Sequence, residues 1–281
     1  MNILFIIGGN DKGGVLTWLN DLANELDQSG HTLFFAAAIK GTSYNSLKKY
    51  GKTNILPAKS KVYNPKIIGG IPWYSLKTIL FNAKCKKVNS IEISKIVDVN
   101  KIDKIITIGY NDIPKLITKR KSVSIISVLH TVPRIDTTPF KIKSRIIAYK
   151  LSKVNQVVSV GNVIKSRLDK YLKEKIILIP NSCKDFSEFK YKKDQIKKQL
   201  NIPLDSICIG SLGRFSKTKG FLELVKVFNV LAKDHLNLHC ILGGGTSNKE
   251  EELYYKEVEK IANESNFSDR IHFLGNVNNQ E

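Results

Sequence analysis

The sequence contains little cysteine, and none of it is paired at metal-binding spacing. Four cysteines are scattered over 281 residues, and no C-x-x-C motif occurs. Disulfide-rich scaffolds and structural zinc sites need closely spaced cysteines, so this distribution argues against both classes. It favours a protein of a reducing cytoplasm.

Long apolar runs are also missing. No stretch approaches the ~18 consecutive apolar residues that a membrane-spanning helix needs. The apolar run at the start, "NILFII", has no basic residue before it and no small-residue cleavage site after it. We therefore expect this run to form a first strand and not a signal peptide.

Acidic residues are scarce in the middle of the chain. The net charge of the whole chain is +20. Residues 1–180 hold 30 Lys and Arg against 11 Asp and Glu, whereas residues 181–281 hold 15 against 14. The first fifty residues are balanced, so the excess lies between positions 51 and 180. This asymmetry indicates a surface that faces a polyanion or a membrane, although a lysine-rich solvated surface explains the same numbers.

The apolar residues that are present occur in short runs, with amphipathic stretches between them. Such runs are typical of strands buried on both faces of a parallel sheet, and the amphipathic stretches are typical of the covering helices. Residues 14–30 show this helical spacing and end at Gly30, a helix stop signal. The expected strands are residues 3–7, 32–38, 104–108, 122–129, 156–160 and 175–179.

The alternation pauses after Ile179 and then resumes. We expect an N-terminal Rossmann-like domain over 1–180, a polar linker with a short helix over 181–204, and a second Rossmann-like domain over 205–281. The second domain is expected to hold only three strands, so it is incomplete beside a five- or six-stranded doubly wound sheet. Its expected elements are strands 206–212, 238–242 and 270–275 and helices 219–234 and 249–265.

One loop concentrates cations without an acid among them. The stretch "GRFSKTKG" places Arg214, Lys217 and Lys219 between a strand end and a helix start, where parallel α/β sheets bind ligands. Free N–H groups of the helix and two cations suit a phosphate or diphosphate. The stretch matches neither the Walker A pattern nor G-x-G-x-x-G. A solvated basic turn is the alternative interpretation.

A second glycine-rich loop follows the first strand. In "GGNDKGG", Gly13 and Gly14 open the first expected helix, where backbone N–H groups can approach an anion closely. Two helix starts of this kind, one in each domain, could face one anion across a cleft. An ordinary glycine turn between strand and helix is the alternative.

These motifs resemble those of family 4 glycosyltransferases, which are retaining enzymes of the GT-B fold. "GRFSKTKG" is similar to the family's G-R-[LFY]-x-x-x-K-G signature. Other segments resemble the family in the same order along the chain: "GGVLTWLNDLANELDQSGHTL", "SVLHTVP", "VVSVGNVIKSRL", "IPNSC", "CILGGGTSNKEEEL" and "RIHFLGNV". Each match is weak alone, but their common order and spacing make the resemblance specific.

The resemblance implies a role for each matching residue. Arg214 and Lys219 would hold the diphosphate of a nucleotide-sugar and stabilise the charge that grows on the leaving group. His130 would hydrogen-bond the donor sugar near the reacting carbon, although a lone histidine is more often structural. No metal or cofactor is expected, because the cations would neutralise the leaving group. The other donor-binding residues implied are Gly13, Gly14, Asn181, Gly244, Gly275, Asn276 and Val277.

The sequence departs from the family pattern in two places. Ser182 replaces the usual glycine after Pro180–Asn181, and Lys184 stands where an aspartate is common. The family's E-x7-E motif, expected after the last matched loop, is absent from these residues. We therefore expect a C-terminally truncated chain in which strand 206–212 is an unpaired apolar edge.

Two basic amphipathic stretches, 72–87 and 141–153, lie within the cationic region. They suit a peripheral position on anionic lipid at the inner face of the cytoplasmic membrane, or else they pack on the core. The resulting expectation is transfer of a hexosyl unit from a nucleotide-diphosphate sugar to an envelope-glycan acceptor, possibly lipid-linked, with retention.

Two other functions compete with this expectation. The first is a catalytically inactive glycosyltransferase-like protein that binds a nucleotide or a partner, which the missing glutamates favour. The second is nucleic-acid binding through the basic half, but no helix-turn-helix, RNA-binding-sheet or zinc signature supports it. We therefore expect no nucleic-acid partner.

Overall fold

A computed structural model describes residues 1–9, 11, 13–58, 66–68, 71–73, 76–111, 113–120, 122–131, 142–181 and 193–276. The chain divides into two compact units, Met1–Cys183 and Lys184–Glu281, each described here by itself. Within the described residues, every helix is too short or too polar to cross a membrane.

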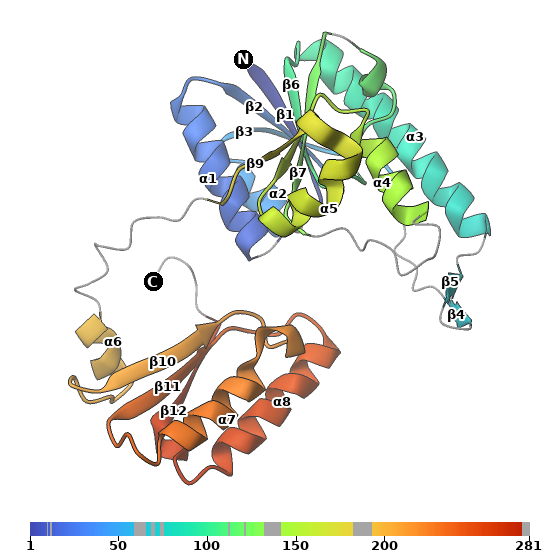
Figure 1. The fold of residues 1–281 in the computed structure, drawn as a ribbon. Helices are drawn as coiled ribbons and strands as arrows, with labels where there is room; N and C mark the ends of the chain where they lie inside the picture. Colours follow the sequence, from blue (N-terminus) through green and yellow to red (C-terminus); the bar gives the residue numbers. More distant parts are fainter. Residues whose placement is uncertain are drawn as a thin grey trace. The chain divides into compact units, whose positions relative to one another are not determined.

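The first unit is built on a seven-stranded sheet with the order β3-β2-β1-β6-β7-β8-β9, in which all neighbouring strands are parallel (Figure 1). The strand order runs outward from β1 on one side and from β6 on the other, so it reverses between these two strands, as in doubly wound folds, and β6 is the central strand. The strands are β1 (Asn2–Ile7), β2 (Thr32–Ala37), β3 (Gly51–Ile55), β6 (Lys104–Ile108), β7 (Ser124–Leu129), β8 (Gln156–Ser159) and β9 (Ile176–Leu178).

Helices cover both faces of this sheet (Figure 1). A separate antiparallel pair, β4 (Lys66–Ile68) and β5 (Ile71–Trp73), precedes the longest helix. The helices are α1 (Gly14–Gln28), α2 (Thr42–Leu47), α3 (Leu76–Val99), α4 (Ile142–Leu151) and α5 (Asn162–Leu172), with short 3-10 turns η1 (Ile117–Lys119) and η2 (Lys173–Lys175).

The alternation of side chains along β1 explains the two cores. Leu4 and Ile6 pack in one cluster with residues of α3, α4 and α5, whereas Phe5 packs in the other with residues of α1 and α2. Successive strand side chains point to opposite faces, so a run that is apolar throughout must be covered on both sides. The sheet is therefore a buried layer whose strand ends, and not its faces, are available for a site.

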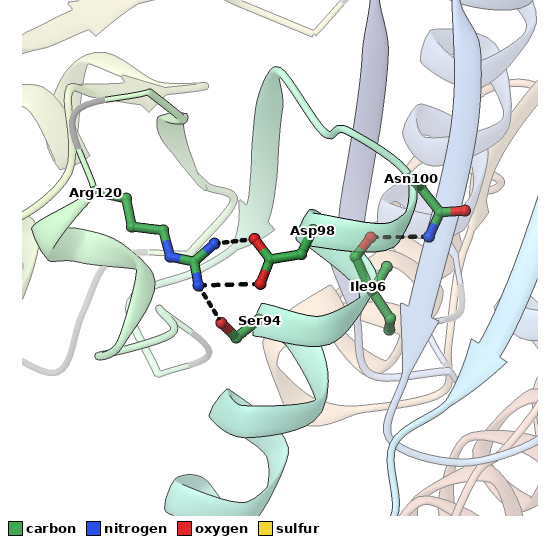
Figure 2. A network of polar contacts seen from close by, with 5 residues as sticks. All are labelled: Ser94, Ile96, Asp98, Asn100 and Arg120. Atoms are coloured by element: carbon green, nitrogen blue, oxygen red, sulfur yellow. Dashed lines mark hydrogen bonds and ion pairs between the residues drawn. The ribbon is translucent and has the colours of Figure 1, made fainter.

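A polar network fixes the C-terminal end of α3 against the chain that follows η1 (Figure 2). The Arg120 guanidinium forms an ion pair with Asp98 and donates from Nη2 to Ser94 Oγ at 2.6 Å. Asn100 Nδ2 donates to the Ile96 carbonyl oxygen at 2.8 Å, which closes the last turn of the helix. The hydrogen bond from Arg120 holds the pKa of the Asp98 carboxyl below its usual range.

The second unit contains a three-stranded parallel sheet with the order β10-β11-β12 (Figure 1). Helices α7 and α8 lie side by side and share one apolar core with the sheet. The elements are α6 (Lys193–Gln199), β10 (Ile207–Leu212), η4 (Lys217–Lys219), α7 (Phe221–Leu231), β11 (Leu238–Gly243), α8 (Lys249–Asn263), η5 (Ser268–Arg270) and β12 (Ile271–Gly275).

Strand β10 forms an edge of this sheet, as the sequence predicts. Within the described residues it pairs with β11 alone, and the side chains of Ile207 and Leu212 are 54% and 68% exposed. By contrast, β11 is the central strand, and Cys240 and Leu242 on it are fully buried. The unit therefore has one well-packed side, formed by α7 and α8, and one open strand.

The α/β prediction is confirmed, and most strand bounds agree to within two residues. Strand β3 and the β4–β5 pair were not predicted, because β3 is mostly polar and because β4 and β5 have only three residues each. The prediction of a helix from Lys219 to Asp234 is wrong at both ends, since α7 covers Phe221–Leu231. Lys219 lies instead in η4, and Gly220 with φ 67° separates that turn from α7.

Candidate functional site

The basic loop of the second unit brings its two predicted anion ligands together. Arg214 and Lys219 are both exposed; Arg214 follows the carboxyl end of β10, and Lys219 is the last residue of the short turn η4. The Lys219 side chain runs along Gly213, with Cε 3.6 Å from the position that a Cβ on Gly213 would take. The stem of Lys219 therefore lies beside the residue that immediately precedes Arg214.

Phe215 anchors this loop to the apolar core of the second unit. It is 1% exposed and stacks on Phe221 of α7 with ring centroids 4.1 Å apart. Tyr255 of α8 meets the Phe215 ring edge-on at 4.7 Å. Aromatic packing of this kind fixes the backbone next to Arg214 while its side chain stays outside the core.

Three loops at the carboxyl ends of β10, β11 and β12 are joined through their backbones. Gly213 N donates to Gly243 O at 2.9 Å, and Gly244 N donates to Gly275 O at 2.7 Å. Phe215 N donates to Gly245 O at 3.0 Å. The loops therefore form one surface at this end of the sheet.

Where these loops touch, Gly245 has no room for a side chain. Asn276 Oδ1 lies 2.0 Å from the position of a Cβ on Gly245, so the Asn276 amide covers that glycine. Gly275 has φ 64° and open space beside it. The predicted donor-binding residues Gly244, Gly275 and Asn276 thus lie on one surface, whereas Val277 is outside the described residues.

The Arg214 guanidinium has a partner that the sequence did not reveal. Its Nη1 donates to Glu251 Oε1 at 2.7 Å, across 37 positions of sequence. The Arg214 side chain is 61% exposed, whereas that of Glu251 is 8% exposed. The Arg214 guanidinium is therefore exposed to solvent while it is held by a buried carboxylate in the first turn of α8.

In the first unit, Gly13 and Gly14 lie at the start of α1, after the carboxyl end of β1. Gly13 is the N-cap, with φ 57°, and no atom lies within 4 Å of a Cβ placed on either glycine. Within the described residues, no side chain caps this helix. Both glycines are exposed at this helix start, a position that suits an anion or a sugar hydroxyl.

The loop before α1 is held by a compact polar cluster. Asp11 Oδ2 accepts hydrogen bonds from the backbone N of Gly9 at 3.2 Å and from Ser43 Oγ at 2.7 Å. Ser43 is fully buried, and its Oγ also accepts from the backbone N of Asp11 at 3.1 Å. The carboxylate is thereby fixed at the same end of the sheet as the α1 start.

His130 follows β7 and packs against α1. Its ring meets the Trp18 ring edge-on, with centroids 4.5 Å apart. His130 Nε2 is buried and has no hydrogen-bond partner among the described residues. Burial lowers the pKa of His130, and the nearby charge of Asp11 opposes that shift only partly. A neutral imidazole with one unpaired, buried nitrogen is suited to a hydrogen bond with a ligand.

The predicted site residues therefore form two groups, one in each unit. The first group surrounds the start of α1 and contains Gly13, Gly14 and His130. Asn181 is exposed and lies three residues beyond β9, at the last described position before the second unit. The second group contains Arg214, Lys219, Gly244, Gly275 and Asn276.

Known proteins resemble this chain in part of its sequence and in its fold. Residues 192–281 match the family model described as Glycosyl transferases group 1. A Bacillus subtilis protein described as an uncharacterized glycosyltransferase, YqgM, is 27% identical over 131 residues, which are 47% of this chain. The match spans only 33% of that relative's length.

Solved structures match the whole chain. A glycosyltransferase from Rickettsia africae matches with a TM-score of 0.76 and 20% identity, covering 98% of this chain and 68% of that one. Anabaena HepE in complex with UDP matches with a TM-score of 0.70 and 16% identity, covering 99% and 70%. The fold is that of GT-B glycosyltransferases. A glycosyltransferase group 1 domain is supported over the second unit, which carries the basic loop.

Sequence reasoning found the cations and glycines of this GT-B chain but missed their side-chain partners. Asp11 and Ser43 lie 32 positions apart, and no local pattern links them. Trp18 was predicted only as part of a helix, so its contact with His130 was not foreseen. For Glu251 one signal existed, because N-x-x-E from Asn248 is a capping box, but that pattern predicts a helix start and not a contact with Arg214.

Proposed function

We propose that this chain binds a nucleotide-diphosphate sugar and transfers its hexosyl unit to an acceptor with retained anomeric configuration. The observation that carries the proposal is the position of Arg214 and Lys219 on one loop after the carboxyl end of a parallel strand, with the Lys219 stem beside Gly213. The group 1 family match over the same residues supports it. A complex with UDP is known for the similarly folded HepE, which supports a nucleotide-sugar donor.

The chemistry follows from where charge develops. Cleavage of the bond between sugar and diphosphate leaves the electron pair on the leaving phosphate oxygen. A guanidinium can bind two phosphate oxygens in a fork, and an ammonium adds a mobile point charge. Cations fixed at the leaving group lower the barrier, because they need little reorganisation during the reaction.

The first-unit group would contact the sugar in this proposal. His130 is suited to hydrogen-bond a sugar hydroxyl, because its pKa is lowered by burial and its Nε2 has no described partner. Gly13 and Gly14, exposed at the start of α1, would bind phosphate or sugar oxygens through backbone N–H groups. The cations would neutralise the leaving group, so a metal is not required by this scheme.

The direct test is an assay of the full chain with UDP-, GDP- and ADP-sugars. Release of nucleoside diphosphate that depends on an acceptor would support transfer, and NMR of the product's anomeric proton would establish retention or inversion. Binding of a nucleoside diphosphate without turnover of any donor would favour the alternative, an inactive glycosyltransferase-like binding protein. Absence of any nucleotide binding would contradict both.

We further propose that the acceptor is an envelope glycan, free or lipid-linked, that the protein reaches from the cytoplasmic side of a membrane. On α4, Ile146 and Tyr149 are 51% and 65% exposed, and Arg145 is exposed beside them. On α3, Leu80 is 61% exposed. Apolar and basic side chains that share exposed helix faces are suited to an anionic lipid surface. The same helix also packs on the core, through Ile147 and Leu151, so Ile146 and Tyr149 belong to its exposed face.

A further inference from the structure

One acid of the second unit is buried although its neighbours are exposed. Glu251 is 6% exposed and is the only buried carboxylate among the described residues. Glu250 and Glu252, in the same first turn of α8, are both exposed. A buried carboxylate is costly unless hydrogen bonds and opposite charge compensate it, so its partners indicate its role.

The backbone at the start of α8 fixes the position of Glu251. Its Oε2 accepts from the backbone N of Ser247 at 2.7 Å. Its own backbone N donates at 2.9 Å to Oδ1 of Asn248, the N-cap of α8, so this cap also fixes the Glu251 backbone. The partial positive charge of the helix start also stabilises a carboxylate there. These contacts are independent of any bound ligand.

The other carboxylate oxygen, Oε1, accepts from Arg214 Nη1 at 2.7 Å. An arginine carries five N–H donors, and this bond uses one of them. Among the described residues, Glu251 is the only partner of the Arg214 side chain, which is 61% exposed. The remaining N–H groups are therefore available to a ligand while the guanidinium is tethered.

We propose that Glu251 is a positioning residue, which holds the Arg214 guanidinium in the orientation that binds the donor diphosphate. This inference rests on the proposed function. A free arginine side chain samples many rotamers, and part of that conformational entropy is lost when a ligand immobilises it. Because Glu251 already restrains Arg214, less of that cost falls on donor binding.

The same carboxylate has an opposing effect, since its negative charge reduces the field of Arg214. Two features make positioning the larger effect. The hydrogen bond from Ser247 and the start of α8 already offset part of the Glu251 charge. The phosphates would also meet Lys219, whose charge no described acid pairs. Removal of Glu251 should therefore weaken diphosphate binding.

The experiment measures binding of UDP, GDP and ADP to the full chain by calorimetry, using the nucleotide that the unmodified protein binds most tightly. The variants are Arg214→Ala, Glu251→Gln and the double variant. Glu252→Gln is the matched control, because it removes the same charge from the same helical turn, at an exposed position that has no contact with Arg214. Circular dichroism and thermal unfolding of each variant establish that it is folded.

We expect Glu251→Gln to weaken binding about tenfold and Glu252→Gln by less than about twofold, in line with coupling between contacting residues. In the Arg214→Ala background, Glu251→Gln should have no further effect. Unchanged or tighter nucleotide binding by Glu251→Gln would overturn the positioning role. So would an equal loss of affinity when Glu251→Gln is introduced with and without Arg214. If Glu251→Gln does not fold, Glu251→Asp keeps the charge but shortens the reach to Arg214, and it should weaken binding similarly.

Failure of the proposed function gives a different result. In that case the unmodified chain binds none of the three nucleotides, or Arg214→Ala binds as tightly as the unmodified chain. A loss with Arg214→Ala that is not coupled to Glu251 would contradict only the role of Glu251.

Discussion

The carbonyl oxygen of Gly213 lies 1.7 Å from the position that a Cβ on Gly244 would take. Gly244 also has φ 138°, a conformation that side-chain-bearing residues rarely adopt. The ends of β10 and β11 therefore meet backbone to backbone. Close packing of the loops is enough to require glycine here, whether or not a ligand approaches it.

The first prediction concerns this contact. Gly244→Ala should lower the free energy of unfolding by more than about 2 kcal/mol, because the methyl group meets a backbone atom and the φ angle is strained. Gly14→Ala is the control, since no atom lies within 4 Å of its Cβ position. It should change stability by less than about 1 kcal/mol. Urea unfolding of both variants measures the difference, and equal losses would contradict the packing argument.

The second prediction concerns the cations. Arg214→Ala and Lys219→Ala should each lower the rate of sugar transfer by roughly 100-fold or more, the typical cost of losing a group that stabilises transition-state charge. Lys226→Ala, on an exposed position of α7, removes the same charge outside the basic loop and should leave the rate unchanged. Steady-state assays with the best donor provide the measurement. Unaltered rates in both loop variants would remove these residues from the mechanism.

The third prediction concerns acid sensitivity. Burial lowers the pKa of His130 in the folded state, so on acidification the unfolded chain takes up this proton first. The stabilisation is complete above the unfolded pKa of about 6.5 and is lost as the pH falls through the folded pKa. His239 and His272, whose pKa values are also lowered, act in the same direction.

His130→Gln should therefore reduce the stability difference between about pH 7.5 and about pH 5.5, the range in which an unfolded histidine titrates. The readout is the change in unfolding free energy with pH, not its absolute value, because the substitution also alters packing against Trp18. A pH dependence identical to that of the unmodified protein would show that His130 does not contribute.

The fourth prediction concerns the exposed face of α4. Arg145→Gln should weaken binding to phosphatidylglycerol vesicles about fivefold, which corresponds to roughly 1 kcal/mol for each cation near the surface. Ile146→Ser with Tyr149→Ser should weaken it further, whereas Val163→Ser on α5, at 55% exposure, should not. Vesicle co-sedimentation measures binding. Equal retention on uncharged phosphatidylcholine vesicles would contradict the electrostatic component.

Much of the fold could be predicted from local patterns. Strands β1, β6 and β11 were found because each is a short apolar run, and such a run has few alternatives to a buried strand. Strand β3 was missed because "GKTNI" carries polar residues, and it becomes a strand only through pairing with β2. The start of α7 was misplaced because a 3-10 turn and a left-handed glycine precede it.

The site divides in the same way between local sequence and tertiary structure. Spacing along the chain alone placed Arg214 and Lys219 on one loop and Gly13 and Gly14 at a helix start, because a short loop keeps its own residues together. Pairing of Arg214 with Glu251, and of Asp11 with Ser43, joins residues more than thirty positions apart. Those contacts depend on strand register and on loops packed backbone to backbone, so only the folded chain could determine them.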